Sequence, residues 1–245
     1  MKPLLRWIAL LAGAALALQI FFVARIALMV VLDPQSTTFQ RSEAWRILHE
    51  KGSLPWRQQW VPYGQISDHL KRAVIASEDD SYASHDGVDW EAMEKAWQKN
   101  SRAEQQAARR AAPSRISAPG RVPKIVGGST ITQQLAKNLL LSGERNLLRK
   151  GQELLLTLVL EALLDKRRIL EIYLNSVEWG EGVFGAQAAA EHYYRKSAAR
   201  LTAYEAARLA VMLPRPKYFE KLPDSAYLSS RAATITARMA QAQLP

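Results

Sequence analysis

Residues 146–164 have the sequence NLLRKGQELLLTLVLEALL, and the second half of this run is apolar on almost every side. A helix that is apolar all round belongs in the core of a protein. Helical patterns extend from 130 to 212, with a glycine-rich interruption at 180–185, and no alternating strand pattern of any length appears. The sequence therefore predicts a mainly α-helical domain built around this buried helix.

A polar stripe crosses the buried helix at a spacing of four residues. Because residues four apart lie on one helix face, two arginines, a carboxylate, a hydroxyl and a second carboxylate point toward one groove. These side chains are Arg145, Arg149, Glu153, Thr157 and Glu161. A buried carboxylate needs partners in any case, since leaving it unpaired costs several kcal/mol. Two interpretations stay open: an internal ion pair between Arg149 and Glu153, or a functional site.

A second polar segment, GGSTITQQLAKN, occupies residues 127–138. Its glycines let the backbone approach a ligand closely, and Thr130 with Gln133 fits a capping box at the start of a helix. Free N–H groups at such a start can hold a phosphate, although the Walker A spacing is missing. An ordinary helix cap is the alternative. The density of further polar side chains favours a ligand site; they are Gln134, Lys137 and Asn138.

Three consecutive carboxylates, Glu78, Asp79 and Asp80, end a predicted helix at 67–77 for which Ser67 is the expected N-cap. Acidic groups at this end oppose the helix dipole, so packing alone does not require them. Crowding by like charges and partial burial raise the pKa of a carboxyl toward the range that a general base needs. The alternative is a solvated acidic turn in which His85 makes local hydrogen bonds.

The N-terminus contains an apolar run long enough to cross a membrane, which takes about 20 helical residues. The run covers 7–32 and includes a single basic residue, Arg25. Lys2 and Arg6 precede it and favour a cytoplasmic N-terminus. A cleaved signal peptide ending near Ala15–Ala17 is the alternative, but hydrophobicity continues well past that point, so we expect an uncleaved anchor.

Composition limits the function classes. The chain has 245 residues, 33 Lys+Arg, 23 Asp+Glu and no cysteine, for a net charge of +10. The hydrophobic fraction of 48% excludes a disordered chain, and the lack of cysteine excludes disulfide scaffolds, zinc ribbons and thiol nucleophiles. Positive charge favours an anionic partner. The expected organisation is a cytoplasmic tail at 1–6, a transmembrane anchor at 7–32, a juxtamembrane region at 33–66, a mainly helical domain at 67–222 with a mobile insertion at 99–124, and a helical tail at 223–245.

Five segments form a further pattern when they are taken in order along the chain. They are Glu78-Asp79 with Tyr82, His85 and Gly87; Gly127–Asn138; Arg149-Lys150 with Glu153 and Glu161; Lys166–Asn175; and Gly180, Gly182 and Gly185 with Ala189-Ala190 and Tyr193-Tyr194. In this order they resemble the peptidoglycan glycosyltransferase family, the transglycosylase domain of penicillin-binding proteins. The sequence departs from the family at Asp80, where a basic or polar residue is more common, at Tyr82, where Phe is common, and in the longer insertion at 99–124.

The resemblance implies a lysozyme-like helical domain with a cleft near the membrane. Within it, Glu78 is implied as the general base that deprotonates the acceptor 4-hydroxyl, and Glu153 as the carboxylate that assists departure of the pyrophosphate. The implied substrate-binding residues are Asp79, Ser129, Thr130, Gln134, Lys137, Asn138, Arg145, Arg149 and Lys150. The implied structural residues near the site are His85, Gly87 and Glu161.

The same resemblance implies lipid II and a lipid-linked glycan as substrates and no organic cofactor, and it leaves open a divalent ion, Mg²⁺ or Mn²⁺, near Glu153. The expected location is the bacterial inner membrane, with the catalytic domain in the periplasm. Membrane lipid and cell-wall synthesis or division proteins are the expected partners, and nucleic acid is not. Since no transpeptidase domain is recognised, cross-linking is expected to come from another protein.

Two other functions compete with this interpretation. A lytic glycosidase can share a lysozyme-like architecture, but it needs one carboxyl kept protonated as an acid. Arg149 and Lys150 beside Glu153 instead favour a charged carboxylate, which suits transfer from a pyrophosphate. A catalytically silent scaffold is the second alternative, and the presence of both Glu78 and Glu153 argues against it.

Overall fold

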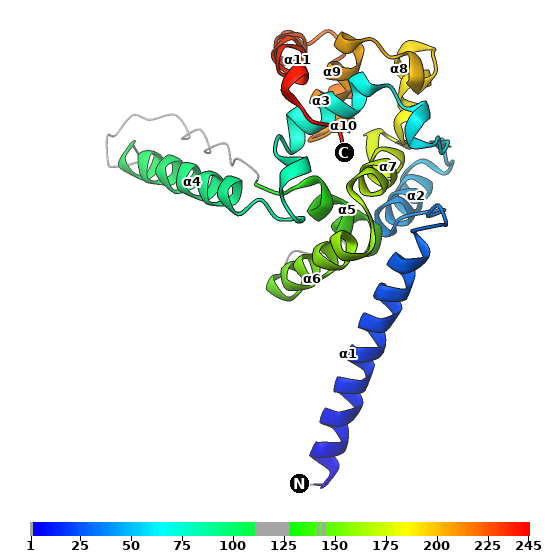
Figure 1. Cartoon of the computed structure of the whole chain (residues 1–245), viewed down its shortest axis with the longest axis vertical. Helices are drawn as coiled ribbons and strands as arrows, with labels where there is room; N and C mark the ends of the chain where they lie inside the picture. The colour runs from blue at the N-terminus through cyan, green and yellow to red at the C-terminus, as the bar shows by residue number, and fades with distance from the viewer. Residues whose placement is uncertain (1, 111–127, 142, 144–145) are drawn as a thin grey trace.

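The structure is a computed structural model that describes residues 2–110, 128–141, 143 and 146–245. It confirms the mainly α-helical prediction (Figure 1). The helices are α1 (Lys2–Leu28), α2 (Thr38–Lys51), α3 (Asp68–Glu78), α4 (Trp90–Arg110), α5 (Ile131–Leu140), α6 (Leu147–Leu163), α7 (Lys166–Ser176), α8 (Ala186–Tyr194), α9 (Ala203–Met212), α10 (Pro216–Glu220) and α11 (Ala226–Arg238). The strands are β1 (Arg57–Gln58), β2 (Glu178–Gly180) and β3 (Val183–Phe184).

The N-terminal helix α1 extends away from the domain as a single rod (Figure 1). Its candidate membrane span, Pro3–Leu28, has a mean hydropathy of 2.2 and is almost entirely exposed. The helix ends four residues before the predicted end of the anchor. Arg168 of α7 donates to the carbonyl oxygens of Met29 and Leu32 over 2.9 and 3.1 Å. Both carbonyl groups belong to the turn that follows α1, so Arg168 ties this turn to α7.

The insertion predicted at 99–124 is partly wrong. Residues 99–110 continue α4, which projects from the side of the domain (Figure 1). Alanine, glutamine, glutamate and arginine, which fill this stretch, are strong helix formers even without apolar periodicity. Residues 111–124 lie outside the described part of the chain. At the start of α4 the carboxylate of Asp89 accepts from the Ala92 amide over 2.7 Å, as the side chain of an N-cap residue does.

The core lies where α3 packs against α9 and α11 and where α5 packs against α6 and α7. Alanines on both partners, including Ala73 and Ala210, are fully buried and let α3 and α9 approach closely. The C-terminal segment is helical, as predicted, and it is also part of the core. Its buried side chains are Leu228, Ala232, Ile235 and Met239.

A three-stranded sheet with the order β1-β3-β2 ties the juxtamembrane region to the domain. β1 pairs with β3 in parallel, with Arg57 opposite Val183, and β2 pairs with β3 in antiparallel. These strands are two or three residues long, too short to show an alternating pattern in the sequence. Gly182 has φ +75° and its α-carbon faces the carbonyl of Pro55, so this turn excludes a side chain.

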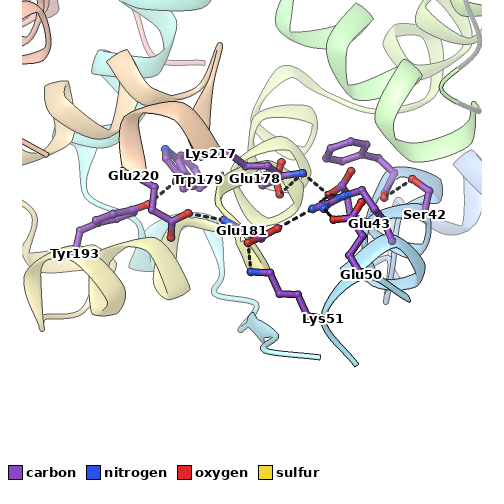
Figure 2. Close-up of polar contacts among 12 residues, drawn as sticks. Ser42, Glu43, Glu50, Lys51, Glu178, Trp179, Glu181, Tyr193, Lys217 and Glu220 are labelled. Atoms are coloured by element: carbon purple, nitrogen blue, oxygen red, sulfur yellow. Dashed lines mark hydrogen bonds and ion pairs between the residues drawn. The ribbon is translucent and has the colours of Figure 1, made fainter. Parts of the chain in front are cut away.

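β2 begins with a buried carboxylate, Glu178, in an ion-pair network between α2, β2 and α10 (Figure 2). Lys217 of α10 lies 3.4 Å from Glu178 and also pairs with Glu43 of α2. Arg46 of α2 joins Glu43 to Glu181, over 2.9 and 3.1 Å. Burial raises the pKa of Glu178 to about 7; Glu43 adds to this effect, and Lys217 and Arg46 oppose it.

This raised pKa predicts how the stability of the protein depends on pH. The pKa of Glu178 is about 7 in the folded protein and 4.5 as its ordinary value, so folding favours the protonated form. Its contribution to stability is therefore complete below pH 4.5 and is lost as the pH rises to about 7. Relative to Glu178→Gln, the free energy of unfolding of the wild type should fall by about 3 kcal/mol over this pH interval, because a shift of one pKa unit corresponds to about 1.4 kcal/mol.

Thermal melting in non-ionic detergent from about pH 4 to about pH 8 measures this difference. Above pH 7 the Glu178→Gln variant should be the more stable protein, because Lys217 keeps Glu43 as its partner. The control is Glu50→Gln, which changes an exposed carboxylate of the same network and should follow the wild-type curve. Parallel curves for the wild type and Glu178→Gln would contradict the prediction.

Candidate active site

Glu78 is the last residue of α3, and its side chain is half-buried. The amide nitrogen of Gln134, on α5, donates to Glu78 Oε2 over 3.0 Å. Gln134 is itself oriented by Tyr173 of α7, whose hydroxyl donates to Gln134 Oε1 over 2.9 Å. Burial raises the pKa of Glu78, and repulsion from Asp79 raises it further. The hydrogen bonds from Gln134 and Ser77 act in the opposite direction and lower it. The arrangement gives a fixed carboxyl that holds a proton more tightly than an ordinary glutamate.

Glu78 lines a cavity of about 180 Å³ between the end of α3 and the start of α5. Ser129, which is exposed, and Thr130 line its α5 side. Asp80 lines the same cavity and pairs with Arg238 of α11 over 2.9 Å. Asp79 is the negative neighbour that adds to the raised pKa of Glu78.

Asp79, predicted to contact substrate, faces the interior and is 7% exposed. Its Oδ2 accepts from the backbone amide of Ile131, the first residue of α5, over 2.9 Å. Its Oδ1 lies 2.8 Å from His85 Nε2. A carboxylate at a helix N-terminus satisfies a free amide and complements the helix dipole. The geometry therefore gives Asp79 the role of fixing α5, and with it Gln134, relative to Glu78.

Thr130 and Gly87 form a second link between the acidic loop and α5. The Thr130 hydroxyl accepts from the Gln133 amide and donates to the Gly87 carbonyl over 2.6 Å, which confirms the predicted capping box. Gly87 has φ +82°, and a Cβ there would lie 2.7 Å from Cγ of Glu161. Because Thr130 is buried and both functions of its hydroxyl are used within the protein, Ser129 is the better placed of the two for a ligand.

Glu153 lies on α6 and is 4% exposed. It pairs with Arg149 over 3.2 Å and with Lys150 on its other oxygen. The internal ion pair that the sequence left open is therefore present, and it holds two cations beside each other. Farther along the stripe, Glu161 accepts from Thr132 of α5 over 2.6 Å and pairs with Lys166 over 2.8 Å.

The exposed face of α5 carries the remaining predicted ligand contacts. Gln134, Lys137 and Asn138 are three and four residues apart, so they share one helix face. Lys137 is exposed and Asn138 is half-buried, whereas their neighbours Leu135 and Ala136 are in the core. The predicted residue Arg145 lies outside the described part of the chain.

The described residues do not fit a divalent ion at Glu153. Each carboxylate oxygen of Glu153 contacts a cation, from Arg149 or Lys150, so neither is free as a ligand. No group of three or more potential metal-ligating side chains occurs within the described ranges. We derive no step of the reaction from a metal.

Three residues near the site were missed by the sequence analysis. Tyr173 orients Gln134, Arg238 lines the cavity, and Arg231 of α11 lies close enough to Glu78 to oppose the rise in its pKa. The two arginines of α11 lie more than 150 residues after Glu78 in the chain, and no local pattern marks them. Tyr173 stands in the segment Lys166–Asn175, which belongs to the family resemblance, but the resemblance assigns no role to this tyrosine.

Known proteins are similar to this chain along nearly its whole length. The family model described as transglycosylase matches residues 47–240. A biosynthetic peptidoglycan transglycosylase of Burkholderia thailandensis is 52% identical over 244 residues, which is 98% of this chain and 88% of the relative. A protein with the same description from Burkholderia vietnamiensis is 51% identical over 246 residues, 99% of this chain and 93% of the relative.

Proposed function

This chain belongs to the transglycosylase family and is a peptidoglycan glycosyltransferase, and from that premise we propose that it polymerises glycan chains from lipid II. The observation that carries the proposal is the Glu78 carboxyl, which lines a cavity and is fixed by Gln134. The proposed donor is the lipid-linked growing glycan, and the proposed acceptor is the 4-hydroxyl of the terminal N-acetylglucosamine of lipid II.

In the proposed reaction, Glu78 takes the proton of the acceptor hydroxyl. The hydroxyl oxygen then attacks the anomeric carbon of the donor, forms a β-1,4 link with inversion, and displaces undecaprenyl pyrophosphate. A raised pKa suits this role, because general-base catalysis is most efficient when the pKa of the base lies near the working pH. Burial raises the pKa of Tyr173 as well, so its hydroxyl stays protonated and keeps Gln134 directed at Glu78.

Cations on α5 and α6 are proposed to bind the leaving pyrophosphate. Lys137 is exposed on α5, and Arg149 and Lys150 lie at the start of α6. A group that gains negative charge in the transition state is stabilised by cations that are already in place. Glu153 forms ion pairs with both Arg149 and Lys150 and so fixes their positions. We propose that Glu153 assists departure of the pyrophosphate in this way, by holding the cations that bind it.

Helix α1 is proposed to anchor the enzyme in the bacterial inner membrane as a single span. Its length and hydropathy suit this role, and Lys2 and Arg6 support a cytoplasmic N-terminus under the positive-inside rule. The catalytic domain is then periplasmic. An anchored enzyme meets a membrane-bound substrate by diffusion along the surface, which raises the effective concentration of both.

The proposal is tested with detergent-solubilised protein and labelled lipid II, followed by separation of the products by length. Polymer that a muramidase digests is the expected result. Release of fragments from preformed glycan without polymer from lipid II would support a lytic glycosidase instead. Folded protein that gives neither product would support a scaffold.

Replacing Lys137 with Ala should mainly weaken donor binding. A charge-assisted hydrogen bond contributes about 1.5 to 3 kcal/mol, so we expect KM for the lipid-linked donor to rise at least about tenfold, with a smaller change in kcat. Initial rates at varied donor concentration measure this effect. Lys221→Ala, at another exposed lysine after α10, is the control. Unchanged KM and kcat would remove Lys137 from the proposed pyrophosphate site.

A further inference from the structure

Two arginines converge on one carbonyl oxygen where α1 meets the domain. Arg25 lies in the last turn of α1, and its Nη2 is 3.4 Å from the carbonyl oxygen of Ser36. Arg41 of α2 donates to the same oxygen over 3.3 Å and to the Ser36 hydroxyl over 3.0 Å. Within the described residues, the ion pairs of the protein include neither arginine.

The position of the pair leaves its positive charge uncompensated. Arg25 and Arg41 repel each other, and a shared neutral oxygen does not offset that repulsion. Arg41 also donates to the hydroxyl of Thr38, the first residue of α2, over 3.1 Å. The N-terminal end of a helix dipole is itself positive, so it favours an anion and disfavours cations. The local charge therefore suits a negatively charged ligand between the two guanidinium groups.

The surroundings of the pair are apolar and lie at the end of the candidate membrane span. Arg25 is three residues before the end of Pro3–Leu28, and Leu28 is 56% exposed. On α2, Trp45 and Leu48 follow Arg41 at spacings of four and three, so the three side chains share one helix face. Trp45 is 66% exposed, and exposed tryptophan is common at the level of lipid headgroups.

We propose that Arg25 and Arg41 bind the phosphate of an anionic glycerophospholipid in the leaflet next to the catalytic domain. Guanidinium groups suit a phosphate because their planar N–H groups match its oxygens in pairs. The exposed apolar side chains favour a lipid over free phosphate, because acyl chains can cover them. The inference rests on the proposed anchoring by α1. It is independent of the proposed polymerisation, since neither arginine lies among the residues assigned to that reaction.

The test is native mass spectrometry of the full chain in neutral detergent, titrated with phosphatidylglycerol or with phosphatidylcholine. The wild type should bind one phosphatidylglycerol more tightly than it binds phosphatidylcholine. Arg25→Gln and Arg41→Gln should each weaken phosphatidylglycerol binding about fivefold, the effect expected for one basic residue at an anionic membrane surface. Arg41→Lys keeps the charge and should fall between the wild type and Arg41→Gln. Arg200→Gln, at an exposed arginine of the domain, is the control and should match the wild type.

Equal affinity for the two lipids, or arginine variants that bind like the wild type, would overturn the proposal. Displacement of the lipid by millimolar inorganic phosphate would also overturn it, because the site would then bind free anions. Polymerisation of lipid II by the same preparations separates this inference from the proposed function. Protein that polymerises but shows no lipid preference contradicts only the lipid site. Protein that binds phosphatidylglycerol at these arginines but makes no polymer contradicts only the polymerase.

Discussion

Glu78→Gln is expected to lower the rate of glycan polymerisation by about a thousandfold, within the range of about 10² to 10⁴ that general-base catalysis contributes. The amide keeps the shape of the side chain, and its oxygen can still accept from Gln134, as Glu78 Oε2 does over 3.0 Å. It cannot take a proton from the acceptor hydroxyl. The loss should therefore fall on kcat, while donor and acceptor still bind.

Initial rates with labelled lipid II, together with thermal melting of the same preparation, measure both parts of this prediction. Asp80→Asn is the matched control, because Asp80 lines the same cavity but is exposed and pairs with Arg238 at the surface. It should retain most of the activity. The pH dependence of kcat/KM reports the groups of the free enzyme, so in the wild type it should show a limb above the usual range for a glutamate, since the pKa of Glu78 is raised. Full activity of a folded Glu78→Gln protein would refute the assignment of the base.

Asp79→Ala is expected to destabilise the domain by about 4 kcal/mol, because hydrogen bonds to a charged group contribute about 1.5 to 3 kcal/mol each. The carboxylate accepts from Ile131 over 2.9 Å and lies 2.8 Å from His85. Alanine leaves the first amide of α5 and the His85 ring without these partners inside the protein. Because Gln134 is on α5, the loss should also disturb the contact that holds Glu78.

The neighbouring substitution Asp80→Ala separates this effect from a simple change of charge. Asp80 is exposed, and an exposed ion pair such as that with Arg238 contributes less than about 1 kcal/mol. Thermal melting in detergent should therefore place Asp80→Ala close to the wild type and Asp79→Ala well below it. An equal decrease in melting temperature for Asp79→Ala and Asp80→Ala would show that the buried contacts of Asp79 do not hold the loop to α5.

Local features of the fold could be predicted from the sequence because they depend on residues three or four positions apart. The N-cap at Ser67 and the capping box of Thr130 with Gln133 are both present, since each uses only the first turn of its helix. The pair of Arg149 with Glu153 has the same origin, one helical turn on α6. At 99–110 the lack of an apolar stripe predicts a loop, but the helix propensity of the alanine, glutamine and arginine residues there gives a helix.

The helical class can be inferred from the sequence alone, and so can the apolar N-terminal helix, the order of the motifs and Glu78 as the candidate base. By contrast, the burial of Asp79 and the exposure of its neighbour Asp80 follow from the tertiary packing, because they depend on where α5 begins in space. It also placed Tyr173 behind Gln134 and Arg238 beside Asp80. Such contacts join elements that are far apart in the chain, so they arise from the packing of α3 against α9 and α11 and of α5 against α7.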